Sequence, residues 1–292
     1  MKPILLFGLF FLFSCTEKNK NKFITTDLQN SNVIYGDDGR TELADVGADF
    51  QQMARSTVAF IPSHKMIYDS IFDVYNFKRE PSYMNFCASE RFRTQPRDAE
   101  CSGTLIAEDL ILTAGHCVPT PKDCKDSKIV FDYKINLNEK TIDSIKSESV
   151  FSCKNVMAFK NQKFDTDFAI VQLDRTVTDR KPLEFSTTEL TYQDQLMLIG
   201  HPDGLPSKVT LNGKVRSLIE ERYFKASLDA FSGNSGSAVF NQLTGKIVGV
   251  LVRGEVDYER KNGCIISKVC SENDCRGEDV TRISEVQKAL IK

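Results

Sequence analysis

Short apolar runs recur along this chain from position 58 onward, and each is only three to seven residues long. Runs of this length, bounded by turn residues, are typical of β-strands. The predicted strands are 58–61, 110–113, 129–135, 168–173, 196–199, 238–240 and 247–252. Turn signals that separate several of them are Asp203-Gly204, Asn212-Gly213 and Asn262-Gly263. Because the strands do not alternate regularly with helices, a parallel α/β architecture is disfavoured.

Apolar periodicity indicates a helix near each end of the chain. Ahead of the strands, apolar residues recur at steps of three and four, which predicts one amphipathic helix. These residues are Leu43, Val46, Phe50 and Met53. The tail repeats the period at Val280, Ile283, Val286 and Leu290. The most economical arrangement is an all-β body of two packed barrels or sandwiches, with a helix at each end.

The N-terminus has the pattern of an export signal. Lys2 precedes a ten-residue apolar run, Ile4–Phe13, whereas a membrane-spanning helix needs about 20 residues. Residues 12–15, Leu-Phe-Ser-Cys, resemble the cleavage box of bacterial lipoproteins. We therefore expect a signal peptide over 1–14 and a lipid anchor on Cys15, with plain secretion as the alternative.

The segment after Cys15 predicts a tether. Residues 15–32 are rich in Lys and Asn and contain little to bury. Residues 33–55 would form an N-terminal extension or a pro-segment. The protein would then be held at a membrane of the cell envelope, in the outer membrane or the periplasm.

The cysteine count agrees with an oxidising compartment. Nine cysteines are present, and if Cys15 carries a lipid, the remaining eight suit four disulfides. A zinc site is the rival interpretation, because Cys264, Cys270 and Cys275 lie close together in the sequence. However, no pair has the C-x2-C spacing of structural zinc sites, and the three histidines are scattered. We therefore expect no metal.

Charge and composition exclude other classes. Lys and Arg total 38 against 40 Asp and Glu, a formal net charge of −2, which argues against a general nucleic-acid binder. Apolar residues make up 41% of the chain, as in a folded globular protein rather than a disordered or multispanning one.

A histidine lies in a recognisable segment. Residues 101–106 read Cys-Ser-Gly-Thr-Leu-Ile, and residues 110–117 read Leu-Ile-Leu-Thr-Ala-Gly-His-Cys. Together they resemble the histidine motif of the chymotrypsin-like serine peptidases. The resemblance implies that His116 is catalytic and that a Cys101–Cys117 disulfide holds its loop at a barrel rim. Closing a loop of this size contributes about 3 kcal/mol.

A serine motif follows in the expected order. Residues 231–240 read Phe-Ser-Gly-Asn-Ser-Gly-Ser-Ala-Val-Phe, which resembles the nucleophile motif of the same clan in its bacterial, glutamyl-endopeptidase-like form. The resemblance implies that Ser235 is the nucleophile and that the N–H groups of Gly233 and Ser235 form the oxyanion hole. Taken alone, the segment would fit a Gly/Ser turn between strands.

The third catalytic group must be a carboxylate, because a neutral imidazole needs one to fix its tautomer. Residues 165–173, Asp-Thr-Asp-Phe-Ala-Ile-Val-Gln-Leu, resemble the family's acidic motif, an Asp directly before an apolar strand. Asp167 fits that register, and Asp165 is the second choice. The order His, Asp, Ser matches the chymotrypsin arrangement.

The resemblance also implies a chymotrypsin-like fold of two packed antiparallel β-barrels. The first would span 56–185 and the second 186–292, including the C-terminal helix, with the site in the cleft between them. The two remaining histidines, His64 and His201, are given structural or surface roles.

Specificity is indicated by two positions. Asp229 lies six residues before Ser235, the spacing of the pocket carboxylate in trypsin-like members. Gly254 ends a strand that resembles a pocket wall, and glycine there keeps the entrance open. Glutamyl endopeptidases place a histidine on this strand, where Leu251 or Val252 stands here, so the resemblance favours substrates with Arg or Lys.

Activation differs from that of the animal digestive members. Those enzymes pair a new N-terminal ammonium with an Asp before the serine, and Asn234 removes that charge. We expect an oxyanion hole that forms without this ion pair. Cleavage at Arg40 or Arg55 would then only remove a blocking segment.

The leading hypothesis is an exported serine endopeptidase that needs no cofactor and acts on protein or peptide substrates. The alternative is a noncatalytic surface lipoprotein that uses the same fold as a binding scaffold, because fold does not fix function.

Overall fold

The structure is a computed structural model that describes residues 36–79, 84–162, 165–254, 256–271 and 275–291. The expected signal peptide, the tether and Cys15 lie outside the described residues. Within this part of the chain, none of the helices combines the length and the apolar content needed to cross a bilayer.

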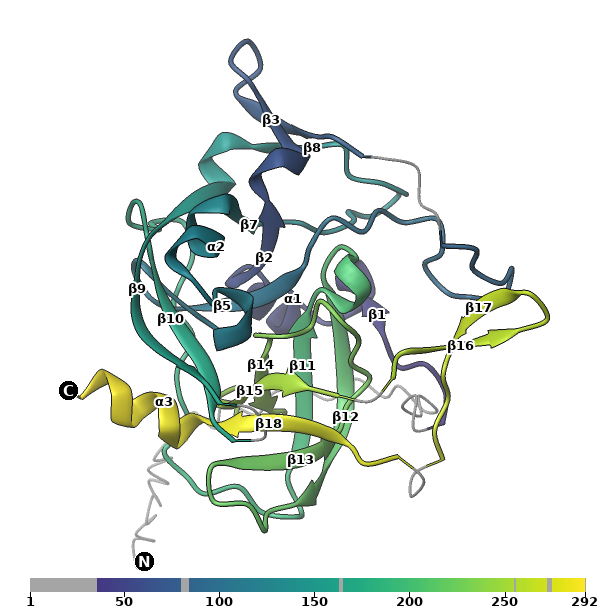
Figure 1. The fold of residues 1–292 in the computed structure, drawn as a ribbon, viewed down its shortest axis with the longest axis vertical. Coiled ribbons are helices and arrows are strands. Elements are labelled where there is room, and N and C mark those ends of the chain that lie inside the picture. Colours follow the sequence, from purple (N-terminus) through teal and green to yellow (C-terminus); the bar gives the residue numbers. More distant parts are fainter. Residues whose placement is uncertain (1–35, 80–83, 163–164, 255, 272–274, 292) are drawn as a thin grey trace, which may run out of the picture.

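The first barrel closes six antiparallel strands in the order β10-β6-β5-β2-β7-β9, and β9 pairs back to β10. Its strands are β2 (Thr57–Pro62), β5 (Cys101–Ala107), β6 (Leu110–Thr113), β7 (Ser127–Phe131), β9 (Val150–Asn161) and β10 (Asp167–Leu173). Their inward side chains form one buried apolar cluster that includes Val58, Leu105 and Phe131. In Figure 1 this barrel is the blue to teal part of the ribbon.

The second barrel closes six further strands in the order β12-β11-β14-β15-β18-β13, because β13 pairs back to β12. The strands are β11 (Gln195–Gly200), β12 (Lys208–Ser217), β13 (Tyr223–Ser227), β14 (Ala238–Asn241), β15 (Ile247–Arg253) and β18 (Glu278–Arg282). A short strand from the N-terminal segment, β1 (Thr41–Glu42), pairs with β12 at the edge. The expected all-β fold of two antiparallel barrels is confirmed.

Smaller elements decorate the barrels. Two small sheets are formed by β3 (Met66–Asp69), β4 (Val74–Phe77) and β8 (Ser144–Lys146), and by β16 (Tyr258–Lys261) and β17 (Cys264–Ser267). The 3-10 turns are η1 (Leu43–Asp45), η2 (Ser63–Lys65), η3 (Gly115–Cys117), η4 (Ser147–Ser149) and η5 (Pro202–Gly204). The α-helices are α1 (Ala48–Ala54), α2 (Pro121–Asp126) and α3 (Ile283–Leu290). The largest apolar cluster joins the barrels, because it contains residues of both, such as Phe168 and Met197.

Both predicted helices are shorter than expected. The first breaks at Gly47, which is extended (φ −59°, ψ 155°) and starts α1 after η1, although Leu43, Val46 and Met53 are buried as predicted. At the other end, Val280 belongs to β18 because its side chain fills the core of the second barrel, and the C-terminal helix α3 begins only at Ile283.

Two strand predictions also need correction. Asn212-Gly213 does not end a strand: it lies inside β12, where Asn212 has a φ of 62° and the pairing register with β11 shifts. The side chain of Gln242 accepts the Asn212 N–H at 2.7 Å, which stabilises this bulge. The strand predicted over 129–135 ends at Phe131 because Asp132 turns the chain with a φ of 59°.

Candidate active site

Asp167 and His116 are in direct contact. Asp167 is the buried first residue of β10, and His116 lies on η3. Asp167 Oδ2 lies 2.7 Å from His116 Nδ1. Asp167 Oδ1 accepts the backbone N–H groups of Gly115 at 2.6 Å and of His116 at 3.2 Å. A carboxylate accepts and does not donate, so Nδ1 carries the proton and Nε2 keeps its lone pair. The pair therefore presents a base at Nε2.

The second barrel holds Asp167 in place from behind. Thr281 on β18 donates its hydroxyl to the Asp167 carbonyl at 2.9 Å, and its oxygen accepts the Asp167 N–H at 3.3 Å. Asp165, the second choice, instead bonds Arg222 at 2.5 Å. Of the two carboxylates, Asp167 is the one placed against His116.

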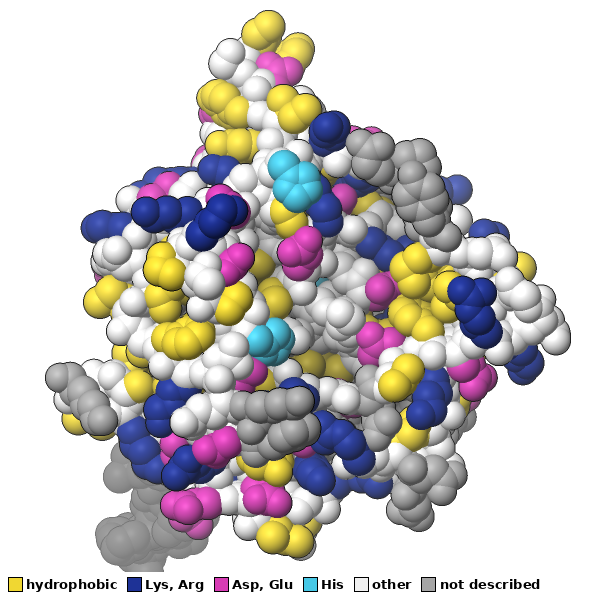
Figure 2. Space-filling model, in the orientation of Figure 1, with side chains coloured by type: hydrophobic (Ala, Val, Ile, Leu, Met, Phe, Trp, Pro, Cys, Tyr) yellow, Lys and Arg dark blue, Asp and Glu magenta, His cyan; other side chains and the backbone are white. Residues whose placement is uncertain are grey.

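Ser235 is brought to the histidine loop from the second barrel. It lies in the loop between β13 and β14, and its carbonyl accepts the N–H of Ser102 on β5 at 2.8 Å. Its carbonyl oxygen also lies 3.6 Å from the Sγ of Cys117, the neighbour of His116. The face drawn in Figure 2 is hollowed near its centre, with a histidine side chain beside the hollow.

A hydrogen-bonded turn with a glycine at positive φ precedes Ser235. The Asn234 N–H bonds the Phe231 carbonyl at 2.9 Å, which closes a turn in which Gly233 has a φ of +90°. The Ser232 carbonyl accepts the N–H of Asp203 at 2.5 Å. In a planar trans peptide the N–H points opposite to the C=O. The Gly233 N–H therefore points away from the Asp203 backbone.

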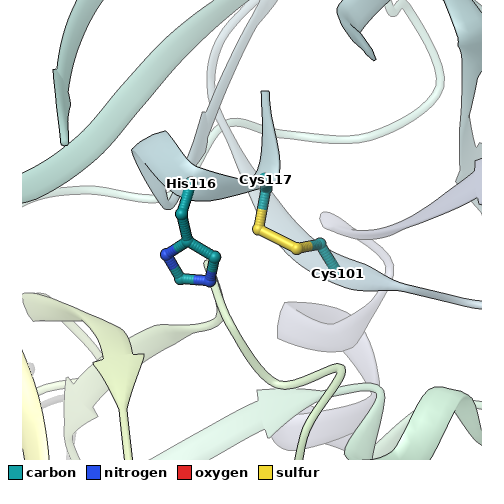
Figure 3. Close-up of side chains that lie close together, drawn as sticks. All are labelled: Cys101, His116 and Cys117. Atoms are coloured by element: carbon teal, nitrogen blue, oxygen red, sulfur yellow. A yellow bond between two sulfur atoms is a disulfide. The ribbon is translucent and has the colours of Figure 1, made fainter. Parts of the chain in front are cut away.

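A disulfide fixes the histidine loop. Cys101 and Cys117 are bonded with their Cα atoms 6.1 Å apart, and Figure 3 shows the bond beside the imidazole. Ligand atoms of Cys101, Cys117 and His116 lie within 4.8 Å of one another, but bonded sulfurs are not thiolates and offer a metal little. The other disulfides are Cys87–Cys264, Cys124–Cys153 and Cys270–Cys275. The cysteines of the rival zinc interpretation are thus all in disulfides.

The remaining histidines lie elsewhere. His64 is exposed on η2. His201 is buried beside Tyr133, with a ring separation of 5.6 Å, and its Nδ1 donates to the Leu205 carbonyl at 3.1 Å. Burial lowers the pKa of His201 to about 3. This histidine is therefore a neutral structural group.

Two carboxylates lie near the expected specificity positions. Asp229 is 1% exposed, and its Oδ2 accepts the N–H of Gly39 at 2.6 Å. Glu278 on β18 is buried, and a β-carbon on Gly254 would lie 1.8 Å from its Oε2. A side chain at position 254 would require the Glu278 carboxylate to move. Arg253, next to Gly254, bonds Asp279 at 3.1 Å.

Sequence reasoning missed the partners that hold the site together. Ser102 donates its hydroxyl to the Gly233 carbonyl at 2.8 Å, and Thr281 braces Asp167. Ser102 lies inside the histidine motif at residues 101–106, so the motif itself could have pointed to it. Thr281 and Glu278 lie far along the chain, and no local pattern marks them.

Comparison with known proteins shows the family of this chain. A family described as a trypsin-like peptidase domain matches residues 101–250. Among solved structures, a serine endoprotease from Yersinia pestis is 14% identical with a TM-score of 0.50, covering 82% of this chain and 63% of that one. Rv3671c from M. tuberculosis H37Rv, solved as an inactive serine-to-alanine mutant, is 14% identical with a TM-score of 0.49, covering 85% and 91%.

The likeness to the Yersinia protein concerns the fold alone, and this chain spans 63% of that protein. A search of curated proteins finds no significant match. The family match extends over more than half of the 292 residues. The chain therefore belongs to the trypsin-like peptidase family.

Proposed function

We propose that this protein is an exported serine endopeptidase that hydrolyses peptide bonds through an acyl-enzyme on Ser235. The observation that carries the proposal is the 2.7 Å contact between Asp167 Oδ2 and His116 Nδ1. It fixes the tautomer in which Nε2 can accept a proton. The Ser102–Ser235 backbone bond at 2.8 Å supports Ser235 as the nucleophile, because it holds the Ser235 loop against the barrel that carries His116.

The reaction begins when Ser235 Oγ attacks the substrate carbonyl carbon while His116 Nε2 takes the hydroxyl proton. The carbonyl oxygen becomes an oxyanion, which accepts the N–H groups of Gly233 and Ser235; losing one such donor costs about 3 kcal/mol in the barrier. The protonated imidazole then gives its proton to the leaving amine, and the acyl group stays on Oγ as an ester. Water attacks the ester in the same way and restores the serine. Asp167 stays ionised throughout and stabilises the imidazolium.

We further propose a preference for Arg or Lys before the cleaved bond. Support comes from the two buried carboxylates, Asp229 and Glu278, and from Gly254 beside the second of them. A buried carboxylate that meets a substrate cation gains a charge-assisted hydrogen bond in a low-dielectric site. The preference predicts that Asp229→Ala abolishes cleavage after Arg and Lys, and an unchanged preference on a peptide panel would refute the role of Asp229.

Export and lipid attachment at Cys15 belong to the same proposal, and the N-terminal sequence alone supports them. Metabolic labelling with a fatty acid in the bacterial host, with Cys15→Ala as the control, tests the anchor. Label retained by Cys15→Ala would contradict it.

Hydrolysis itself is tested with an unbiased library of internally quenched peptides. The full-length protein should cleave a subset of peptides, and Ser235→Ala should cleave none. A folded wild-type protein that cleaves none under any condition from pH 6 to 9 would favour the binding-scaffold alternative.

A further inference from the structure

We propose that Arg40 is a positioning residue that holds the loop carrying Gly233 in its active shape, so that the chain is active without a freed N-terminus. The proposal rests on the proposed function, because it concerns the oxyanion hole of that reaction. It concerns residues 38–42, here called the strap, and the loop 229–234.

Arg40 is buried to an unusual degree for a charged side chain, with 1% of it exposed. Its Nε and Nη2 donate to Asp38 at 2.9 and 2.6 Å, and Nη2 also donates to Glu90 at 3.3 Å. The guanidinium carbon lies 4.0 Å from the ring centroid of Phe231. Charged groups are buried this fully only when paired. Arg40 therefore has a fixed orientation, with its guanidinium over the Phe231 ring.

The strap is bound to the second barrel on both sides of Arg40. Thr41 and Glu42 pair as β1 with β12, which fixes the backbone beside Arg40. On the other side, the Gly39 N–H donates to Asp229 at 2.6 Å. The strap thus contacts Asp229 at the start of the loop and Phe231 in its middle.

Phe231 transmits this contact to the oxyanion hole. It is 5% exposed and is the first residue of the turn that contains Gly233. In such a turn the Ser232–Gly233 peptide can rotate as a unit, because glycine accepts both signs of φ. A rotated peptide would aim a carbonyl, rather than the Gly233 N–H, at the developing charge. Fixing the Phe231 ring against Arg40 disfavours that rotation.

Asn234 explains why the fold needs such a device. Its side chain is 1% exposed and carries no charge, so it offers an N-terminal ammonium no ion pair. In place of an ammonium freed by cleavage, the internal side chain of Arg40 supplies the buried positive charge beside the loop. Cleavage next to Arg40 would detach the strap and lower activity, the opposite of releasing a blocking segment.

The test compares Arg40→Met with Arg180→Met in the full-length protein. Arg180 is a matched control: its side chain is 3% exposed, its guanidinium carbon lies 4.3 Å from the Phe131 centroid, and it pairs with Asp132 and Asp179, none of which belongs to the loop. Each variant is measured for kcat, KM, melting temperature and affinity for a peptide boronate, whose tetrahedral adduct on serine needs the oxyanion hole.

We expect Arg40→Met to lower kcat and boronate affinity by about 30-fold, or about 2 kcal/mol at 1.36 kcal/mol per tenfold, with KM changed less than about threefold. Arg180→Met should leave kcat and boronate affinity unchanged even if its melting temperature falls as far. Equal changes in kcat and boronate affinity in the two variants would overturn the proposal.

Phe231→Leu keeps the test decisive if Arg40→Met does not fold, because it removes the stacking face without stranding a buried charge. It should also lower kcat and boronate affinity at nearly constant KM, and wild-type values would overturn the proposal. A second arm follows the intact mass of the wild-type chain: activity that appears only after cleavage between residues 38 and 56 would also overturn it. A wild-type chain inactive in every form would instead refute the proposed function itself.

Discussion

Asp167→Asn is expected to lower kcat/KM by about 10⁴, or about 5.5 kcal/mol at 1.36 kcal/mol per tenfold. The reason lies in the three bonds of this carboxylate. Its Oδ1 accepts two backbone N–H groups, and its Oδ2 faces His116 Nδ1. An asparagine at this position can place its carbonyl oxygen in only one of these two positions, and its NH2 group then takes the other.

The backbone N–H groups of Gly115 and His116 determine the orientation of the asparagine amide. If the amide NH2 faced the N–H groups of Gly115 and His116, two buried hydrogen bonds would be lost, at about 1–3 kcal/mol each. The carbonyl therefore takes the Oδ1 position, and the NH2 donates to His116 Nδ1. The imidazole proton must then move to Nε2, where it blocks proton transfer from Ser235.

The assay is kcat/KM on the best peptide from the library, together with the rate of inactivation by a fluorophosphonate. Circular dichroism should show an intact fold. Asp165→Asn is the control, because Asp165 bonds Arg222 and does not contact His116. The reasoning is refuted if Asp167→Asn stays within tenfold of the wild type, or if Asp165→Asn loses as much.

Three further changes test other parts of the structure. Burial lowers the pKa of His201 to about 3, so between pH 6.5 and pH 3 only the unfolded state gains a proton at this histidine. The free energy of unfolding should therefore fall by about 1.4 kcal/mol per pH unit below pH 6.5. Urea unfolding of wild type and His201→Gln at pH 7 and 5 checks this, and an equal loss of unfolding free energy in the two proteins would contradict it. Replacing Cys101 and Cys117 by alanine together should lower the free energy of unfolding by about 3 kcal/mol, whereas a change below about 0.5 kcal/mol in urea would show that the bond contributes little. Glu278→Gln should reduce kcat/KM for Arg and Lys peptides at least tenfold relative to Leu peptides, and an unchanged ratio would remove Glu278 from the pocket that Asp229 is proposed to share.

The barrel strands could be predicted where local pattern and burial coincide. The runs at 110–113 and 168–173 became β6 and β10 because every second and often every residue there is buried. β9 was missed although residues 156–159, Val-Met-Ala-Phe, form a short apolar run, because polar residues interrupt the strand at 152, 154 and 155 and most of its second half is exposed. Asn212-Gly213 was misread because the same left-handed backbone serves a hairpin turn and a β-bulge.

The candidate site was predictable only as far as contiguous motifs reach. The segments around His116, Asp167 and Ser235 each carry a local pattern, and the fold then brings Asp167 to His116. The contact of Arg40 with Phe231 joins residues 191 positions apart. This contact depends on the pairing of β1 with β12. Because β1 is only two residues long, it has no sequence pattern from which a strand could be predicted. Contacts of this kind follow from tertiary packing rather than from local propensity.

The central claim is that His116 activates the hydroxyl of Ser235. Its most direct test is labelling of the folded full-length protein with a fluorophosphonate, followed by intact mass measurement and peptide mapping. We expect one adduct per chain, located on Ser235, and almost none in His116→Ala. An adduct on another serine, or equal labelling of wild type and His116→Ala, would contradict the claim.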